Sequence, residues 1–90
     1  MVVIGKIHLV REEQKFTETF SKKEVIVETV EQYPQYYPID FANNNINMLD
    51  GYQAGDLVEV NVNVRGNLSK AEGQEDRAFV SLVGWKITKR

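Results

Sequence analysis

The chain has 90 residues, of which 42% are hydrophobic and 27% are charged, and its formal net charge is -2. These values are typical of one small globular domain, residues 1–90, and a weakly acidic chain has no overall attraction for nucleic acid, so such a role would need a local patch or base stacking. The absence of cysteine excludes disulfides and thiolate metal sites.

The N-terminal residues predict a strand over 2–10, VVIGKIHLV, in which Gly5 indicates a bend or bulge where the sheet curls. The apolar run at the N-terminus, MVVIG, is far shorter than a membrane span and lacks the features of a secretory signal. We therefore expect a cytoplasmic protein with no membrane partner.

Two further strands and a short helix follow. Residues 22–30 are rich in β-branched side chains, and 36–42, YYPIDFA, form the third strand, where Pro38 implies an edge position or a bulge. The only candidate helix is NNNINMLDGY, residues 43–52, at most two turns long. Asn43 or Asn44 could cap it, and Asp50-Gly51 would end it.

The fourth strand, GDLVEVNVNVRG at 55–66, places four valines on one side and polar residues on the other. We interpret the valines as core, and the polar side as solvent surface or a subunit contact. The fifth strand is 78–88, in which we expect Trp85 to be a core residue.

Five strands with one short helix between the third and fourth are the layout of an all-β, five-stranded Greek-key OB-fold barrel. Two connections, 11–21 and 66–77, are longer than hairpin turns require. An OB barrel binds ligands on strands two and three and on these two loops, so the layout predicts a ligand site there.

From Tyr36 to Ile87 the chain resembles the OB domain of bacterial single-stranded DNA-binding proteins. The matching pieces are YYPIDF, INMLDGYQAGDLVEVNVNVRG, NLSKAEGQEDR and AFVSLVGWKI. The first 35 residues, with IGKI and KKEVIVETVEQYP, are more similar to a small family of OB proteins from Bacteroidetes and their phages, described as similar to single-stranded DNA-binding proteins. The resemblance implies single-stranded DNA binding and homo-oligomers.

This chain departs from the pattern of those proteins at several places. Where they commonly carry stacking aromatics, it has Ala42 and the aromatic-free hairpin NLSKAEG, and it stops at ITKR without their long tail and acidic tip. We therefore do not expect partner recruitment through such a tip.

Base stacking requires exposed aromatic rings, and the strand pattern selects the candidates. If Tyr37, Ile39 and Phe41 point into the barrel, Tyr36 points outward, and Tyr33 lies just before it. The alternative for both tyrosines is that they only cover the mouth of the barrel.

Phe16 and Phe20 lie in the first long connection beside Lys15, Lys22 and Lys23. They either pin this loop to the core, the interpretation that we favour because exposed phenylalanines promote aggregation, or form an aromatic and basic flap over a bound strand.

The remaining candidate phosphate contacts are Arg65, Lys70 and Arg77. Because Glu72, Glu75 and Asp76 lie in the same hairpin, these cations could instead be engaged in salt pairs. Any affinity would then be moderate and strongly dependent on salt.

The residue inventory argues against an enzyme. His8 is the only histidine, the carboxylates are scattered over different strands, and no phosphate-binding loop or metal cluster is present in the sequence. We therefore expect no cofactor, no metal and no small-molecule substrate.

The first hypothesis is a non-catalytic protein that binds single-stranded DNA, or RNA as well, largely independently of sequence, in DNA replication, recombination or repair. The stacking residues would be Tyr33, Tyr36, Phe16 and Phe20, and the phosphate contacts Lys22, Lys23, Arg65, Lys70 and Arg77. The second hypothesis is an OB-fold protein-interaction or assembly module without nucleic-acid binding. Oligosaccharide binding through the same face is the third.

Overall fold

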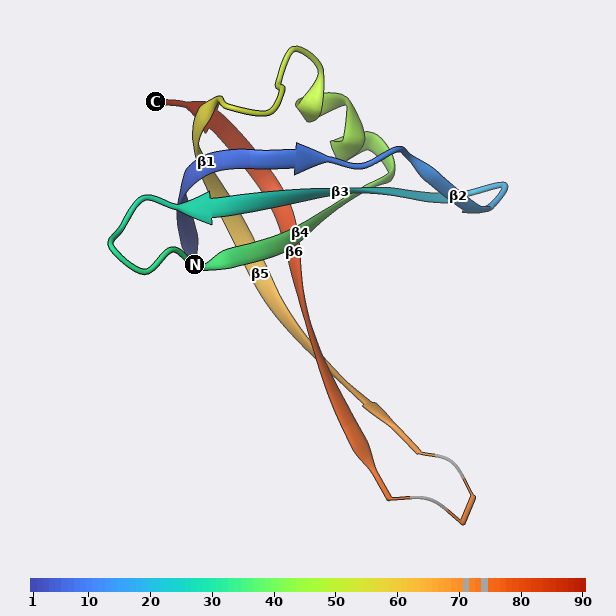
Figure 1. Ribbon diagram of the computed structural model, residues 1–90. Helices are drawn as coiled ribbons and strands as arrows, with labels where there is room; N and C mark the ends of the chain where they lie inside the picture. The colour runs from blue at the N-terminus through green and yellow to red at the C-terminus, as the bar shows by residue number, and fades with distance from the viewer. Residues whose placement is uncertain (71, 74) are drawn as a thin grey trace.

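The computed structural model describes residues 1–70, 72–73 and 75–90. Six strands and one short 3-10 helix make up the fold (Figure 1). In chain order they are β1 (Val2–Val10), β2 (Gln14–Thr17), β3 (Phe20–Thr29), β4 (Tyr36–Ala42), η1 (Asn43–Leu49), β5 (Leu57–Ser69) and β6 (Arg77–Lys89).

Five of the strands close into a barrel. Their order is β1-β5-β6-β4-β3, and β3 pairs back with β1. All pairs are antiparallel except β4 with β6, where Ile39 lies beside Leu82 and Asp40 beside Val83. With η1 between β4 and β5, this is the predicted OB fold, and the four-residue β2 is an addition to it.

The core follows from the alternation of side chains along the strands. Among the described residues, eleven hydrophobic residues are buried: Val3, Ile7, Val25, Val27, Ile39, Phe41, Leu49, Val58, Val60, Val62 and Ile87. Three of the four valines of β5 predicted to be core, Val58, Val60 and Val62, are buried, whereas Val64 is exposed because it lies where β5 leaves the barrel for the long ribbon with β6. β1 is curved in Figure 1, and its partner changes from β5, paired with Val2 to Lys6, to β3, paired from Gly5 onward.

Two local predictions are wrong. Trp85 is 48% exposed, because a bulge in β6 pairs Lys86 with Asn61 but Gly84 with Val62, and the extra residue, Trp85, points outward. Neither asparagine caps η1: its N-cap is Ala42, and the side-chain Oδ1 of Asn43 instead accepts a hydrogen bond of 3.0 Å from the amide of Ser21.

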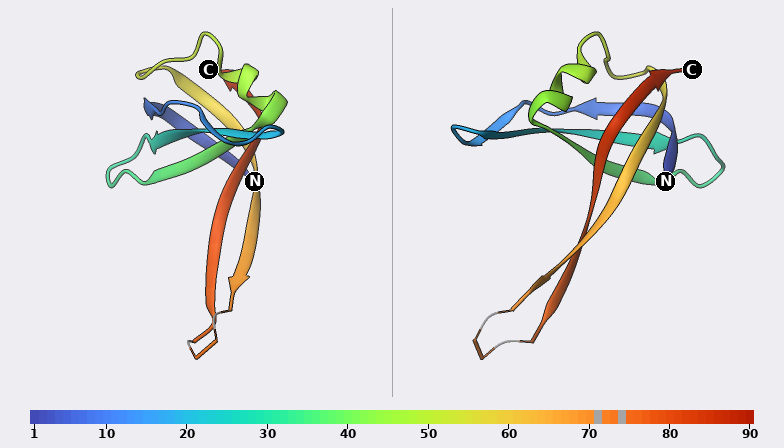
Figure 2. Two further views of the ribbon diagram at one scale, coloured as in Figure 1. Left: turned by 90° about the vertical axis from the view of Figure 1, so that its right-hand side faces the viewer. Right: turned by 180° about the vertical axis from the view of Figure 1, so that it is seen from behind.

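Both long connections contain more strand than expected. In the first, β2 pairs with the start of β3, as in Gln14 with Lys22, and forms a hairpin that projects from the barrel. In the second, the ladder continues to Ser69 and Arg77. We call the resulting two-stranded ribbon, residues 64–69 with 77–82, the arm; Figures 1 and 2 show it extending well beyond the barrel.

Candidate nucleic-acid interface

The outward residues of β3 and β4 form one surface, which we call the outer face. Its cross-strand pairs are Lys22 with Ala42, Glu24 with Asp40, Ile26 with Pro38, and Glu28 with Tyr36. These residues alternate with buried side chains such as Val25, Ile39 and Phe41, so they point away from the core. Tyr36 is 55% exposed, which confirms its predicted outward orientation.

Three carboxylates lie on the outer face, and each has a cationic or titratable partner. Arg11 Nε donates to Glu24 Oε1 at 3.0 Å, and Lys22 Nζ lies 3.8 Å from Asp40 Oδ2. The third, Glu28, has His8, whose Nδ1 is 3.6 Å from Glu28 Oε1. The outer face is therefore not a basic surface, and phosphates can approach it only beside these pairs.

Asp40 is the most perturbed of these groups. Burial raises its pKa above the usual value, the neighbouring Lys22 acts to lower it, and Glu24 adds to the increase. One of its oxygens, Oδ1, is buried and has no hydrogen-bond partner among the described residues. The charged form of Asp40 is consequently less stable in the folded protein than in water.

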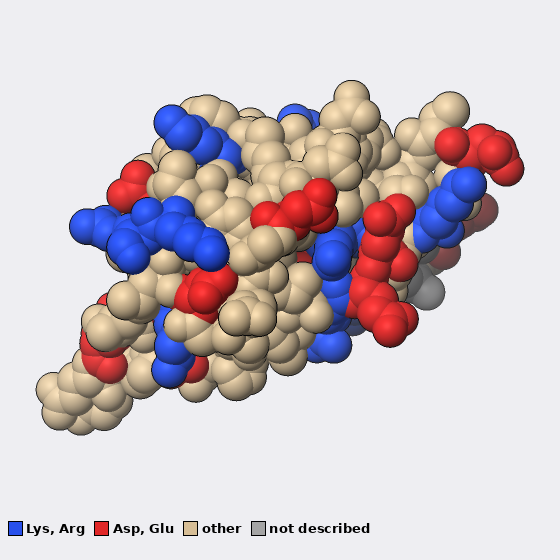
Figure 3. Space-filling model, turned by 90° about the horizontal axis from the view of Figure 1, so that it is seen from above, with Lys and Arg blue, Asp and Glu red and all other residues tan. Residues whose placement is uncertain are grey.

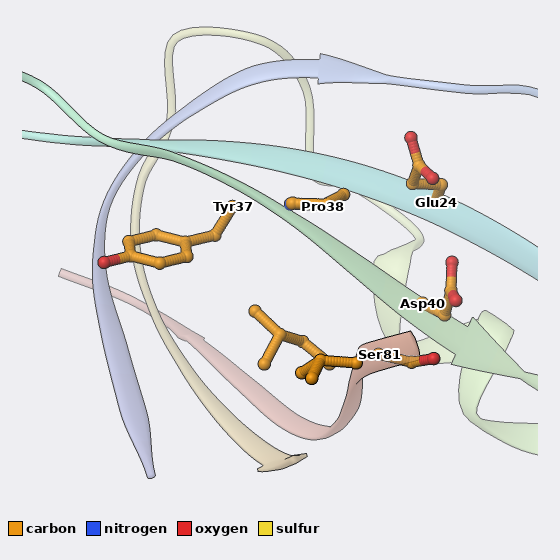
Figure 4. A pocket seen from close by; sticks show the side chains of 7 residues that line it. Glu24, Tyr37, Pro38, Asp40 and Ser81 are labelled. Carbon is orange, nitrogen blue, oxygen red and sulfur yellow. The ribbon is translucent and has the colours of Figure 1, made fainter. Parts of the chain in front are cut away.

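Asp40 borders a cavity of about 450 Å³ where the arm leaves the barrel (Figure 4). The cavity is lined by Glu24, Tyr37, Pro38, Asp40, Val80, Ser81 and Leu82. Glu24 and Asp40 point the same way from neighbouring strands, whereas Tyr37 lies at the opposite end of the cavity. The cavity connects the outer face with the base of the arm.

The two candidate tyrosines are both accessible. Tyr36 packs edge-on against the ring of His8, with centroids 5.4 Å apart and an interplanar angle of 78°. Tyr33, in the connection between β3 and β4, is 75% exposed, and its carbonyl accepts a hydrogen bond from Gln35 Nε2 at 3.2 Å. Each ring therefore has surface available for stacking.

Phe16 and Phe20 are exposed by 54% and 42%, so the expectation that they pin the loop to the core is wrong. Their rings stack on each other with centroids 5.6 Å apart, and Lys22 Nζ lies 5.4 Å from the centre of the Phe16 ring. Phe20 pairs with Thr17, and Phe16 lies at the register shift between Lys15 and Thr17, so the two rings meet across the β2–β3 hairpin and cover each other outside the core. Exposed rings beside a lysine are the arrangement that the alternative interpretation, an aromatic and basic flap, requires.

Lys23 does not join this flap. It pairs with the buried Phe41, whereas Lys22 pairs with Ala42, so the two lysines lie on opposite sides of the sheet. Of the two, the outer face contains Lys22 alone.

The arm has one polar and one apolar side. The polar side carries Arg65, Asn67, Ser69, Arg77, Phe79 and Ser81, which are paired across the ladder. Since Asp40 pairs with Val83, and Ser81 is two residues earlier on β6, this side continues the outer face. The apolar side carries Val64, Gly66, Leu68, Ala78, Val80 and Leu82.

Phe79 is the binding candidate that the sequence analysis missed. It is 52% exposed, lies opposite Asn67, and is two residues from Arg77 on the same side of the arm. It follows the 66–77 segment, which contains no aromatic residue and in which residues 71 and 74 lie outside the described residues. The sequence signal for Phe79 is its spacing of two residues from both Arg77 and Ser81, which places all three on one side of a strand.

On the face shown in Figure 3, charged residues of both signs are interspersed. Lys70 is exposed just beyond the end of β5. Among the described residues no group of three or more His, Cys, Asp or Glu side chains could hold a metal ion. Within the same residues, no helix has the length and apolar character needed to cross a membrane.

A family model described as "Domain of unknown function (DUF3127)" matches residues 2–88. No curated protein matches the sequence. Two crystal structures of the mitochondrial single-stranded DNA binding protein Rim1 from S. cerevisiae, one of them selenomethionine-labelled, are similar to this chain. Each has a TM-score of 0.72 and 22% identity over 99% of this chain and 91% of that chain, which shows a shared OB fold.

Proposed function

This chain belongs to the DUF3127 family, and we propose that it is a non-catalytic protein that binds single-stranded DNA, largely independently of base sequence. The observation that carries this proposal is the set of exposed aromatic rings that have a cationic or titratable side chain nearby. Phe16 lies beneath Lys22, Tyr36 contacts His8, and Phe79 lies near Arg77. The likeness to Rim1, a single-stranded DNA binding protein, supports the same function.

In this proposal the strand runs from the β2–β3 hairpin across the outer face to the polar side of the arm. Bases stack on Phe16, Phe20, Tyr36 and Phe79, with Tyr33 at the margin, and each stacked base contributes about 1 to 3 kcal/mol. Arg65, Arg77, Lys70 and Lys22 contact phosphates. Because carboxylates share these surfaces, binding weakens strongly as salt is added.

The cellular setting is part of the proposal. We propose that the protein serves DNA replication, recombination or repair in the cytoplasm, with RNA as a second ligand. The resemblance of KKEVIVETVEQYP to OB proteins of Bacteroidetes and their phages supports a bacterial or phage setting. We also propose a homo-oligomer, since exposed apolar side chains gather on the outer side of β1, β5 and β6. They are Val2, Ile4, Leu57 and Trp85. Such a patch favours a partner subunit.

A protein-interaction module without nucleic-acid binding is the second candidate. It is favoured by the apolar side of the arm, where Val64, Leu68 and Val80 are exposed by 54%, 58% and 72%. An isolated apolar ribbon is a surface that a protein partner could cover. DNA binding requires the polar side of the arm, whereas a protein interface requires its apolar side, so substitutions on the two sides distinguish the two candidates.

The decisive experiment is fluorescence anisotropy of a labelled single-stranded oligonucleotide at low and moderate salt, with unlabelled duplex as competitor. Saturable binding that salt weakens and duplex does not displace is expected. Phe79→Ala should weaken it about tenfold, while Val80→Ala, one residue away on the opposite side of the arm, should leave it unchanged.

Tyr36 provides a second matched pair on the outer face. Tyr36→Ala should weaken binding by a similar factor, whereas Tyr36→Phe, which keeps the ring, should bind nearly as the parent does. A flat titration at low salt, where electrostatic attraction is greatest, would refute DNA binding and leave the interaction module. Sensitivity to Val80→Ala together with indifference to Phe79→Ala would refute the assigned binding surface.

A further inference from the structure

A bulge in β1 turns His8 toward the outer face. The register between β1 and β3 shifts between Ile7 and Leu9, so His8, which lies between them, has no partner on β3. Bulges of this kind re-aim a side chain and are common beside functional sites. Here the imidazole is directed onto Tyr36 of β4 and Glu28 of β3.

The geometry of this cluster is specific. His8 Nδ1 is 3.6 Å from Glu28 Oε1, and the His8 ring meets the Tyr36 ring edge-on at 5.4 Å. The side chain of His8 is 50% exposed and that of Glu28 is 22% exposed. Since Nδ1 faces the carboxylate, Nε2 lies on the other side of the ring, away from Glu28.

The contact of His8 with Glu28 differs from the other ion pairs of the outer face. Arg11 pairs with Glu24 and Lys22 pairs with Asp40, so two of the three carboxylates face an arginine or a lysine. Glu28 is the only one of the three carboxylates whose partner is an imidazole, a group that changes charge between pH 5 and 8.

The other charged groups near His8 do not replace it. Lys6 lies opposite Glu28 in the register of β1 and β3 but makes no ion pair within 4.0 Å among the described residues. Glu31 lines the same cavity as Lys6 and Glu28 and adds a second negative charge. When His8 is neutral, Glu28 therefore has no ion-pair partner within 4.0 Å among the described residues, and together with Glu31 it disfavours a phosphate next to Tyr36.

We propose that His8 and Glu28 form a proton-controlled phosphate subsite beside Tyr36, which binds the phosphodiester of the nucleotide stacked on that ring. Protonation of His8 compensates the charge of Glu28 and makes Nε2 an additional charged donor for a phosphate oxygen. Binding of single-stranded DNA then takes up a proton and becomes tighter as the pH falls. This inference rests on the proposed function.

The test is a titration of labelled oligothymidylate at pH 5.5 and pH 8.0 at constant ionic strength, because thymine itself does not titrate in this range. The parent protein should bind about fivefold more tightly at pH 5.5, the ratio that corresponds to about 1 kcal/mol for one added charge contact near water. Thermal unfolding of each variant at both pH values checks that it is folded.

Two substitutions separate the roles of the pair. His8→Asn should lose the pH dependence and bind at both pH values as the parent does at pH 8.0. Glu28→Gln should bind more tightly than the parent at pH 8.0 and show a smaller ratio between the two pH values. Glu12→Gln, a control carboxylate in the connection after β1, should keep the ratio of the parent.

The outcomes distinguish this inference from the proposed function. Equal affinity of the parent at both pH values, or a His8→Asn variant that keeps the parent's ratio, would overturn the proton-controlled subsite and leave DNA binding standing. No binding by the parent at either pH would overturn both.

Discussion

Asp40 shows, at the scale of a single residue, that the outer face is not arranged for stability alone. Burial deprives Oδ1 of water without supplying a hydrogen-bond donor among the described residues, and Lys22 compensates only through Oδ2 at 3.8 Å. Its pKa is therefore raised in the folded protein. A carboxylate with a raised pKa stabilises the fold below its unfolded value of 3.8, and this contribution is lost as the pH rises through the folded pKa.

Replacing Asp40 with asparagine should therefore stabilise the protein at neutral pH. Asparagine has the shape of the protonated acid but no charge to desolvate, so Asp40→Asn should be more stable than the parent at pH 7 by less than about 1 kcal/mol, since the site is partly solvated. The gain should shrink toward zero below pH 3.8. Urea unfolding between pH 3 and pH 7 measures it, and a variant less stable than the parent at pH 7 would show that the Lys22 pair outweighs the burial.

Gly84 is required for a different reason, the packing of the Phe41 ring. A Cβ at position 84 would lie 2.5 Å from Phe41 Cζ, and that ring is fully buried, so it has nowhere to move. We expect Gly84→Ala to destabilise the protein by about 1 to 3 kcal/mol. Gly66→Ala is the matched control on the arm, where an added Cβ meets nothing within 4 Å, and its thermal midpoint should stay close to that of the parent. Equal midpoints for both variants would contradict the packing argument.

At the scale of elements, alternation predicted the strands with a buried side and failed where a strand has none. The buried valines of β5 and the pair Ile39 and Phe41 of β4 mark their strands clearly. β2 is exposed throughout, so its sequence carries no pattern of burial, and only pairing with β3 makes it a strand. Alternation also failed at Trp85, because a bulge reverses the orientation of every later residue and a sequence does not reveal where a bulge will form.

The β2–β3 hairpin should therefore contribute to binding and little to stability. Replacing both Phe16 and Phe20 with serine removes two exposed rings that pack on each other and on Lys22, not on the core. We expect the free energy of unfolding to change by less than about 1 kcal/mol, while the affinity for single-stranded DNA falls about tenfold or more. Thr17→Ser in the same hairpin is the control for anisotropy and for urea unfolding. A large loss of stability in the double variant would restore the interpretation that these rings pin the loop.

For the whole molecule, the layout of the OB barrel followed from the order of strands and helix, but the assembly of the site did not. The sequence placed Lys22 and Lys23 together, whereas the sheet separates them onto opposite sides. It weighed the hairpin cations only against the acidic residues beside them, whereas the ladder brings Arg65 and Arg77 to the side of the arm that carries Phe79. The partners in both cases are set by cross-strand register, which depends on residues far apart in the chain.

The arm is the part of the molecule whose function can be separated from that of the barrel. Beyond the contact of Ile39 and Asp40 with β6, its strands pair only with each other, and no residue of β5 after Val62 or of β6 before Leu82 belongs to the buried core. Replacing residues 66–80 by the turn Asn-Gly would join Arg65 directly to its ladder partner Ser81. The barrel core would be untouched, so the urea midpoint should stay near that of the parent.

The affinity of this shortened protein for single-stranded DNA should fall, although its stability stays near that of the parent. The shortened protein loses Phe79, Lys70 and Arg77 together, so it should bind a long oligonucleotide at least about tenfold more weakly, with a shallower dependence on salt because fewer counterions are released. A short oligonucleotide that covers only the outer face should be affected much less. If neither oligonucleotide lost affinity, the bound strand would not extend from the barrel along the arm, and the apolar side of the arm would become its main functional surface, as a protein interface.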